Sequence, residues 1–308
     1  MRVVGPDRKA ASIAVETRRR LEPRTVREVA AQLDRLPKGG SALVVAPYLS
    51  PATRERLRES AIGFLDLTGN IYLQLVSPGL FIEAAGADID PDRKQRPSRS
   101  LRGAKAGRVV RALVDAKAPP GVRELAERAG VDPGYTSRLV ALLDREALVE
   151  RSDRGGIASV DWPALLRRWA EDAPLDSRGA LATTLDPRGL SSLQTRLRDV
   201  DTAYAITGSL AAAAFAPVAA PRLAIVYVED LKAAMTDLGL RPVDTGANVW
   251  LIEPSDSLVF EGAVERGGLR YVAPSQAAAD LLGSPGRGPA EAEELIAWMQ
   301  QQEEAWRG

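Results

Sequence analysis

The sequence contains no cysteine and no histidine. A chain without thiols or imidazoles cannot form disulfides, use a cysteine nucleophile or a histidine base, or build a zinc site from these ligands. This composition favours either chemistry based on carboxylates and hard metal ions or no catalysis. The lack of cysteine also fits a cytoplasmic location.

Long apolar stretches are absent as well. No run approaches the roughly 18 residues of a membrane-spanning helix, and the first twenty residues lack the apolar core of a signal peptide. We therefore expect a soluble, cytoplasmic protein with no membrane partner. The 41 basic and 41 acidic side chains cancel, so any affinity for nucleic acid must come from local charge. A length of 308 residues favours two or three domains.

The most informative stretch is VRELAERAGVDPGYTSRLVALLDREAL, residues 122–148. Its first part has apolar residues at helical spacing, which predicts a short amphipathic helix. Gly130 is suited to end that helix, because glycine adopts the left-handed backbone conformation without strain. Asp132 is a typical N-cap and Pro133 fits the first position of a second helix. The pattern predicts a helix-turn-helix.

The second helix begins with small and polar residues that suit contact with DNA. Hydroxyl groups can reach phosphates or base edges, and arginine can bond guanine in bidentate fashion. The residues that follow, LVERSDRGGIASVDW, predict two short strands around a turn, as in the wing of a winged helix. The alternative is a helical hairpin used only for core formation. The DNA-contact candidates of the second helix and wing are Tyr135, Thr136, Ser137, Arg138, Arg151 and Arg154.

A basic segment precedes this region. Residues 93–111 carry eight Lys or Arg and no acidic residue, and they lead into an amphipathic helix. Such a run is either a solvated linker or a set of phosphate contacts. We favour phosphate contacts, with Lys105 and Arg108 as the candidate residues, and predict a linker at 91–104 and a winged helix domain at 105–175.

Residues 1–90 predict a small α/β domain. A helix from Val26 to Leu36 precedes a buried strand at 42–46, and a second helix follows Ser50 and Pro51. Three strand candidates come next, at 63–67, 70–75 and 80–83. This order resembles the restriction-endonuclease-like fold, with Asp66 and Glu83 on adjacent strands as candidate metal ligands. Because the catalytic lysine position is occupied by Ala85, we expect a degenerate scaffold.

Residues 176–308 predict a second α/β domain. Strands are expected at 203–206, 223–228, 249–252 and 271–272, and helices at 210–215, 275–282 and 289–302. Thr207-Gly208-Ser209 after the first strand is similar to the phosphate-binding turn of nucleotidyltransferases. That enzyme also needs two carboxylates on the next strand, which has none, since Glu229 and Asp230 lie only at its exit. We expect this domain to be catalytically inactive.

Together these segments resemble the AbiEi-like antitoxins and regulators of type IV toxin–antitoxin systems. The similarity lies in TGSLAAAAFAPVAAPRLAIVYV (207–228), VAPSQAAADLLGSPGRGPAEAEEL (272–295) and the winged segment, and covers roughly residues 100–308. It implies a winged helix-turn-helix joined to a nucleotidyltransferase-like domain that lacks catalytic acids. DNA binding carries over to Tyr135, Thr136, Ser137 and Arg138. The roughly one hundred preceding residues depart from the shortest family form.

The sequence thus predicts a multidomain protein of α/β and α+β class, with a central winged helix-turn-helix flanked by two α/β domains. We expect a sequence-specific regulator that binds double-stranded DNA, in the manner of an autorepressing antitoxin, without catalytic residues, metal or cofactor. Homo-oligomerisation is expected because paired half-sites raise specificity. The alternatives are a metal-dependent nuclease using Asp66 and Glu83, a nucleotidyltransferase using Glu229 and Asp230, and an adaptor that binds a protein toxin.

Overall fold

A computed structural model describes residues 1–5, 8–33, 41–88, 90–91, 100–152, 155–200, 202–216 and 220–308. The chain is a mixed α/β protein that divides into two compact units. The first unit comprises Met1–Ser98 with Ala141–Ala147, and the second comprises Arg99–Val140 with Leu148–Gly308. Of the linker predicted at 91–104, residues 92–99 lie outside the described residues.

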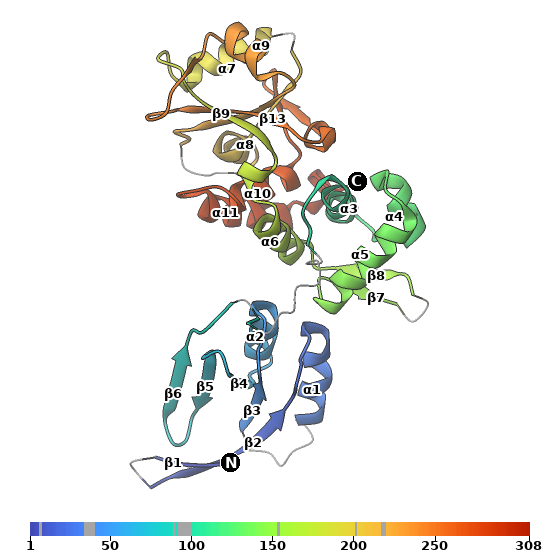
Figure 1. Cartoon of the computed structure of the whole chain (residues 1–308), viewed down its shortest axis with the longest axis vertical. Helices are drawn as coiled ribbons and strands as arrows, with labels where there is room; N and C mark the ends of the chain where they lie inside the picture. The colour runs from blue at the N-terminus through green and yellow to red at the C-terminus, as the bar shows by residue number, and fades with distance from the viewer. Residues whose placement is uncertain are drawn as a thin grey trace. The chain divides into compact units, whose positions relative to one another are not determined.

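The first unit is built on a six-stranded sheet in the order β1 to β6 (Figure 1). The two parallel pairs join β2 to β3 and β3 to β4, while the remaining neighbours are antiparallel. Ser50 caps the start of α2 as predicted, because its hydroxyl accepts a hydrogen bond from Thr53 N. The elements are β1 (Arg2–Val4), β2 (Ala10–Thr17), η1 (Pro23–Thr25), α1 (Val26–Leu33), β3 (Ser41–Ala46), α2 (Pro51–Glu59), β4 (Gly63–Asp66), β5 (Ile71–Leu75) and β6 (Leu80–Ala84).

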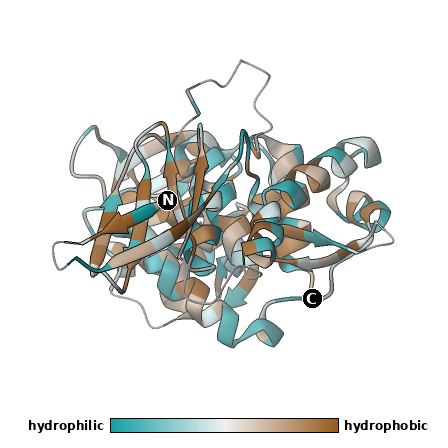
Figure 2. Cartoon of the chain, turned by 90° about the horizontal axis from the view of Figure 1, so that it is seen from below, coloured by the Kyte–Doolittle hydropathy of each residue, from teal (hydrophilic) through white to brown (hydrophobic). Residues whose placement is uncertain are grey.

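Alternating residues of the strands give this sheet two apolar faces. Val44 of β3 packs with Val29 of α1 and Leu57 of α2 in one buried cluster. Leu43, its neighbour in β3, joins a smaller cluster with Ile13 of β2 on the opposite face. Such alternation follows from the two-residue repeat of a β-strand, and the apolar positions colour the strands brown in Figure 2. The main core of this unit therefore lies under the two helices.

The second unit begins with three helices and a hairpin. They are α3 (Ala104–Asp115), α4 (Val122–Ala129), α5 (Pro133–Arg145), β7 (Val149–Arg151) and β8 (Ile157–Val160). Helix α5 crosses the division between the units, since its last residues group with the first unit. Helices α4 and α5 and the β7–β8 hairpin occur at the positions that the sequence predicts. Helix α6 (Trp162–Asp172) follows, capped by Asp161, and buries the predicted apolar side formed by Leu165, Leu166 and Trp169.

The remainder of the second unit is a mixed seven-stranded sheet in the order β12-β9-β13-β11-β10-β15-β14. Figure 1 shows α7 and α9 on one face and α8, α10 and α11 on the other. The strands are β9 (Gly179–Leu185), β10 (Tyr204–Thr207), β11 (Ala224–Val228), β12 (Arg241–Pro242), β13 (Val249–Pro254), β14 (Val264–Arg266) and β15 (Leu269–Tyr271). The helices are η2 (Leu175–Ser177), α7 (Leu190–Asp199), α8 (Gly208–Phe215), α9 (Leu231–Asp237), η3 (Ser257–Phe260), α10 (Pro274–Leu282), α11 (Gly288–Gln301) and η4 (Glu303–Ala305).

A buried polar network joins α3 to this sheet within the second unit. Arg111 of α3 is 3 % exposed, and its Nη1 donates to Gln276 Oε1 of α10 at 3.0 Å. Gln276 Nε2 donates to Asp280 Oδ1 at 2.8 Å. Asp280 Oδ2 then accepts hydrogen bonds from Thr207 at 2.7 Å and Tyr227 at 3.1 Å. Because buried polar groups need fixed partners, this chain of bonds holds α3 in one orientation on the seven-stranded sheet and its covering helices, which we call the sheet domain.

None of the helices formed by the described residues is both long and apolar enough to cross a bilayer.

Candidate nucleic-acid interface

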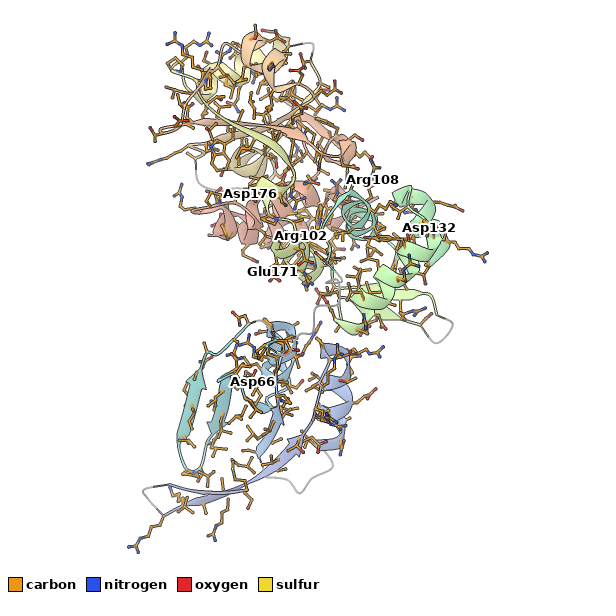
Figure 3. All side chains as sticks on the ribbon, in the orientation of Figure 1. Asp66, Arg102, Arg108, Asp132, Glu171 and Asp176 are labelled. Carbon is orange, nitrogen blue, oxygen red and sulfur yellow. The ribbon has the colours of Figure 1, made fainter. Side chains whose placement is uncertain are left out.

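The turn between α4 and α5 has the geometry that the sequence predicts. Gly130 adopts φ +59° and ends α4. Asp132 Oδ1 then accepts a hydrogen bond from Tyr135 N at 2.9 Å, which caps the first turn of α5. Figure 3 labels Asp132 in this turn. The two helices are therefore connected by three residues, with the first turn of α5 placed immediately after the cap.

The first turn of α5 carries an exposed polar surface. Gly134, Ser137 and Arg138 are exposed, and Tyr135 is half-buried. Arg138 Nη1 lies 3.4 Å from the position that a side-chain carbon would take at Gly134, so the guanidinium lies along the first turn. Burial raises the pKa of the Tyr135 hydroxyl, and the charge of Arg138 partly offsets this rise. The Tyr135 hydroxyl therefore stays protonated near neutral pH.

Thr136 does not belong to this surface, and its prediction as a DNA-contact residue is wrong in this structure. Its side chain is fully buried, and its hydroxyl donates to Asp132 O at 3.1 Å. A helix turns by about 100° per residue, so Thr136 faces inward while Ser137 faces out. The buried side of the helix continues through Leu139 and Leu143.

Lys105 and Arg108 of α3 have different environments. Lys105 is exposed. Arg108 instead forms ion pairs with Asp256 at 2.8 Å and Glu261 at 3.0 Å, and donates to Ser257 Oγ at 3.4 Å. The hydrogen bond to Asp256 raises the pKa of Arg108. Figure 3 labels Arg108 on α3. Its guanidinium is paired with acidic side chains of the same unit, an environment that does not favour the predicted phosphate contact.

The hairpin places one candidate arginine on its surface. Arg151 is exposed, and its Nη2 donates to Gly155 O at 2.9 Å across the hairpin. Strands β7 and β8 pair in antiparallel register from Val149 and Val160 to Arg151 and Ile157. Arg154, the second candidate of this hairpin, lies outside the described residues.

The sequence argument missed two cations of α4. Arg123 and Arg128 are both exposed on this helix. Arg128 Nη2 lies 2.6 Å from Glu124 Oε1, as a surface ion pair four residues apart. Helical spacing relative to the buried Leu125 and Ala126 already indicates that both arginines face outward, so the periodicity of the segment contained this signal.

The carboxylates proposed for a nuclease site are separated. Asp66 lies at the end of β4 and Glu83 on β6, with β5 between them, so the expectation of adjacent strands is wrong. Glu83 is exposed and pairs with Arg58 at 2.5 Å. Among the described residues, no group of three or more acidic side chains gathers as metal ligands would.

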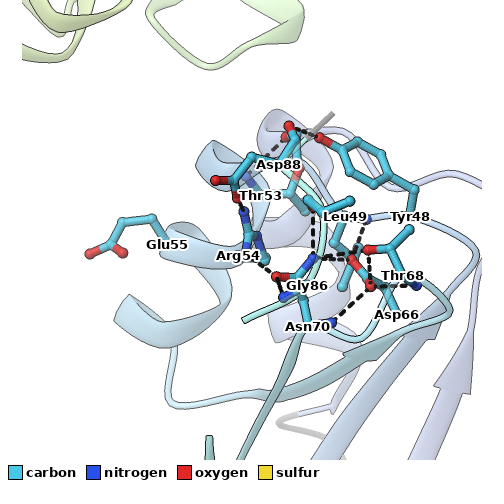
Figure 4. A network of polar contacts seen from close by, with 12 residues as sticks. Tyr48, Leu49, Thr53, Arg54, Glu55, Asp66, Thr68, Asn70, Gly86 and Asp88 are labelled. Atoms are coloured by element: carbon cyan, nitrogen blue, oxygen red, sulfur yellow. Dashed lines mark hydrogen bonds and ion pairs between the residues drawn. The ribbon is translucent and has the colours of Figure 1, made fainter. Parts of the chain in front are cut away.

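Asp66 is instead the centre of a structural network (Figure 4). The carboxylate is 2 % exposed and accepts hydrogen bonds from Leu49 N, Thr68 N, Thr68 Oγ1, Asn70 N and Asn70 Nδ2. Asn70 Oδ1 in turn accepts from Arg54. Burial alone would raise the pKa of Asp66, but the hydrogen bonds from Thr68, Asn70 and Leu49 outweigh it, and the pKa is lowered. These donors fill the positions that a metal ligand would keep open.

The turn compared with nucleotidyltransferases is also accounted for by structure. Gly208 has φ +66°, and an added side-chain carbon would lie 3.0 Å from Ile225 Cδ1, so glycine is required there. The hydroxyl of Thr207 is bound to Asp280. Of the two acids at the exit of β11, Glu229 is exposed and Asp230 caps α9 through Lys232 N and Ala233 N. Asp230 thus has a local structural role.

Comparisons of the chain with protein-family models, with curated proteins and with solved structures find no match.

Proposed function

We propose that α4, α5 and the β7–β8 hairpin form a winged helix-turn-helix that binds double-stranded DNA in a sequence-specific manner. The observation that carries the proposal is the amphipathic character of α5, with a polar exposed first turn and an apolar buried side. The first turn exposes Gly134, Ser137 and Arg138, while Leu139 and Leu143 are buried behind it. In this class of domain the first turn of the second helix enters the major groove.

The exposed groups have distinct roles in this proposal. Arg138 contacts a guanine edge, and Ser137 contacts a phosphate or base edge. Arg123 on α4, Lys105 on α3 and Arg151 on the hairpin neutralise phosphates, because each is exposed and cationic. The charge at this surface is local, in a chain with no net charge, so we expect moderate affinity with a small salt slope.

The flanking domains support a regulator more than an enzyme. We propose that the seven-stranded domain is nucleotidyltransferase-like and inactive, and that the first unit is a degenerate restriction-endonuclease-like scaffold. The supporting observations are the local capping role of Asp230 and the saturated hydrogen bonding of Asp66. An AbiEi-like autorepressing regulator, acting as a homodimer and with or without a toxin partner, is the finer form of this proposal and depends on the sequence resemblance.

The test is a DNA-binding titration with Arg138→Ala. Fluorescence anisotropy is measured with a duplex from upstream of the coding sequence and with a scrambled duplex, at several salt concentrations. Loss of a bidentate base contact weakens specific binding by about 1–3 kcal/mol and reduces the preference between the two duplexes. Lys105→Ala weakens binding to both duplexes and lowers the salt slope by about 1.

Arg222→Ala is the matched control. Arg222 is an exposed arginine of the same unit, before β11 and away from α4, α5 and the hairpin in sequence. We expect its affinity to equal that of the unmodified chain. The proposal is wrong if neither the upstream duplex nor genome-wide mapping reveals a preferred sequence, or if Arg222→Ala and Arg138→Ala have the same effect.

A further inference from the structure

We refer to α3, α4, α5 and the β7–β8 hairpin as the helical module. A cavity of about 580 Å³ opens in the second unit between this module and the sheet domain. One wall comes from α3 and α4, including Arg111, Ala112 and Ala129. The other wall, contributed by helices of the sheet domain, includes Phe215 of α8 and Trp298 of α11. Cavities of about 300–1,000 Å³ with apolar walls and a few polar groups are typical of small-molecule sites, and none of the activities considered above uses this one.

The sheet-domain wall is aromatic. Phe215 stacks on Trp298 with ring centroids 6.0 Å apart and an interplanar angle of 27°. Phe215 itself is buried between Trp298 and the guanidinium of Arg266. Trp298 and Trp306 line the same cavity and are half-buried, so part of each indole is open to it. Aromatic surface of this kind favours an aromatic ligand, because contacts between aromatic rings add to the energy of area burial.

The charge of the lining favours an anion. Its side chains include five arginines and three acids, namely Arg108, Arg111, Arg128, Arg266, Arg307, Asp115, Glu261 and Glu304. The internal partners already described occupy the guanidinium groups of Arg108 and Arg111.

Arg128 and Arg307 form ion pairs with Glu124 and Glu303, which leaves Arg266, in the part of the chain that the structure describes, as the arginine of this lining without an ion pair. Its side chain is exposed on β14, Nη1 donates to Ala214 O at 2.6 Å, and the guanidinium lies 4.7 Å from the Phe215 ring centroid. Within the described residues it has no carboxylate partner at ion-pair distance. A guanidinium held over an aromatic ring without an ionic partner is suited to bind a carboxylate or phosphate.

We propose that this cavity binds a small planar aromatic molecule that carries a carboxylate or phosphate group. The ring packs against Trp298 and Trp306, and Arg266 binds the anionic group. Because α3 and α4 form the other wall, the bound molecule contacts both halves of the second unit. Its binding therefore changes the affinity for DNA, a consequence that rests on the proposed function.

The binding test is isothermal titration calorimetry of the full chain with indole-3-acetate and with AMP. Their uncharged counterparts, indole-3-acetamide and adenosine, are titrated in parallel. We expect one of the two anions to bind, and its counterpart to bind at least about tenfold more weakly, equivalent to about 1.4 kcal/mol. The two arms distinguish a carboxylate from a phosphate ligand.

Arg266→Gln and Arg270→Gln are the matched variants. Both arginines are exposed on the same β14–β15 hairpin, but only Arg266 lines the cavity. Arg266→Gln weakens binding of the anion by about tenfold, and Arg270→Gln leaves it unchanged. The proposal is overturned if neither anion binds at about 10 mM, which corresponds to less than about 2.7 kcal/mol. Equal binding by both variants and the unmodified chain also overturns it.

A DNA titration with and without the bound anion separates this inference from the proposed function. If the anion binds through Arg266 but the chain binds no DNA, the site stands and the proposed function fails. If the chain binds DNA with the same affinity in both titrations, the regulatory part of the inference fails. A change in affinity that Arg266→Gln abolishes supports both.

Discussion

Thr136 and Ser137 are neighbours with opposite surroundings, and this difference gives a test at the level of single residues. Thr136 is fully buried, and its hydroxyl is bonded within the helix to Asp132 O. Ser137 is exposed. We expect Thr136→Val to leave the affinity for DNA unchanged, because valine keeps the shape of a side chain that DNA cannot reach. Ser137→Ala removes an exposed hydroxyl that contacts DNA in the proposed complex, so it lowers affinity by about 1 kcal/mol.

Fluorescence anisotropy measures both variants, and circular dichroism confirms that each keeps its helix content. A fall in affinity for Thr136→Val with Ser137→Ala unaffected would mean that α5 presents a different face to DNA. That result would remove the structural basis of the proposed interface.

Asp66 allows a prediction about stability in the first unit. Replacing it with alanine leaves buried donors of Leu49, Thr68 and Asn70 without an acceptor. Because unsatisfied buried groups keep their full desolvation cost, we expect Asp66→Ala to lower the free energy of unfolding by about 2–4 kcal/mol. Urea denaturation measures the change. A nuclease ligand at a preformed open site would give the opposite result, since its removal relieves charge and costs no hydrogen bonds.

The lowered pKa of Asp66 also sets the pH at which this contribution disappears. The unfolded-state pKa of aspartate is about 3.9, and the folded-state pKa lies below it. The ionised carboxylate therefore stabilises the fold fully above that value, and the contribution is lost as pH falls through the folded-state pKa. We expect the stability difference between the unmodified chain and Asp66→Ala to be constant near neutrality and to shrink below about pH 4. A difference that grows on acidification would contradict this assignment.

At the level of secondary-structure elements, local signals predicted much of what the structure shows. Gly130, Asp132 and Pro133 set the boundaries of α4 and α5, because caps and backbone conformation depend on near neighbours. The predicted elements do not include strands β1, β2, β9, β12 and β14 or helices α7 and α9, although β2 alternates in burial. Short strands owe their stability to partners that are distant in the chain.

In the candidate site, too, the sequence indicates features set by near neighbours and not those set by distant contacts. The exposure of Ser137 and Arg138 follows from helical periodicity. The pairing of Arg108 with Asp256 joins residues 148 positions apart, so no local pattern could reveal it. The cavity beside α3 likewise depends on contacts between distant segments. The sequence therefore indicated which helix is suited to DNA, but not which cations serve the fold.

Gly134→Ala tests the first turn of α5 as an element. Alanine is favoured over glycine in a helix by about 1 kcal/mol. The added carbon would lie 3.1 Å from Asp132 Oδ1, which must shift by a few tenths of an ångström, and 3.4 Å from Arg138 Nη1, at the limit of ordinary contact. We expect the thermal unfolding temperature to change by only a few degrees, equivalent to about 1 kcal/mol or less, while DNA affinity falls because the methyl group stands on the exposed surface proposed to face DNA. Unchanged affinity would show that this turn does not lie close to DNA.

For the whole molecule, the division into two units predicts two unfolding transitions, with α3 unfolding together with the sheet domain. Arg111 is the link, since it binds Gln276 and Glu261 O and forms an ion pair with Asp115. Arg111→Met leaves these buried partners unsatisfied. We expect one calorimetric transition to lose about 3–5 kcal/mol of stability and the other to remain unchanged.

Arg128→Met is the control for that experiment. Arg128 forms an exposed ion pair with Glu124 in the same unit, and exposed pairs contribute about 0–1 kcal/mol. Its transition temperatures should therefore match those of the unmodified chain. If Arg111→Met instead splits a transition in two, the helical module unfolds separately from the sheet domain and the buried network does not couple them. If only one transition is affected and it remains single, a molecule bound beside α3 acts on one cooperative body that includes α4 and the first turn of α5.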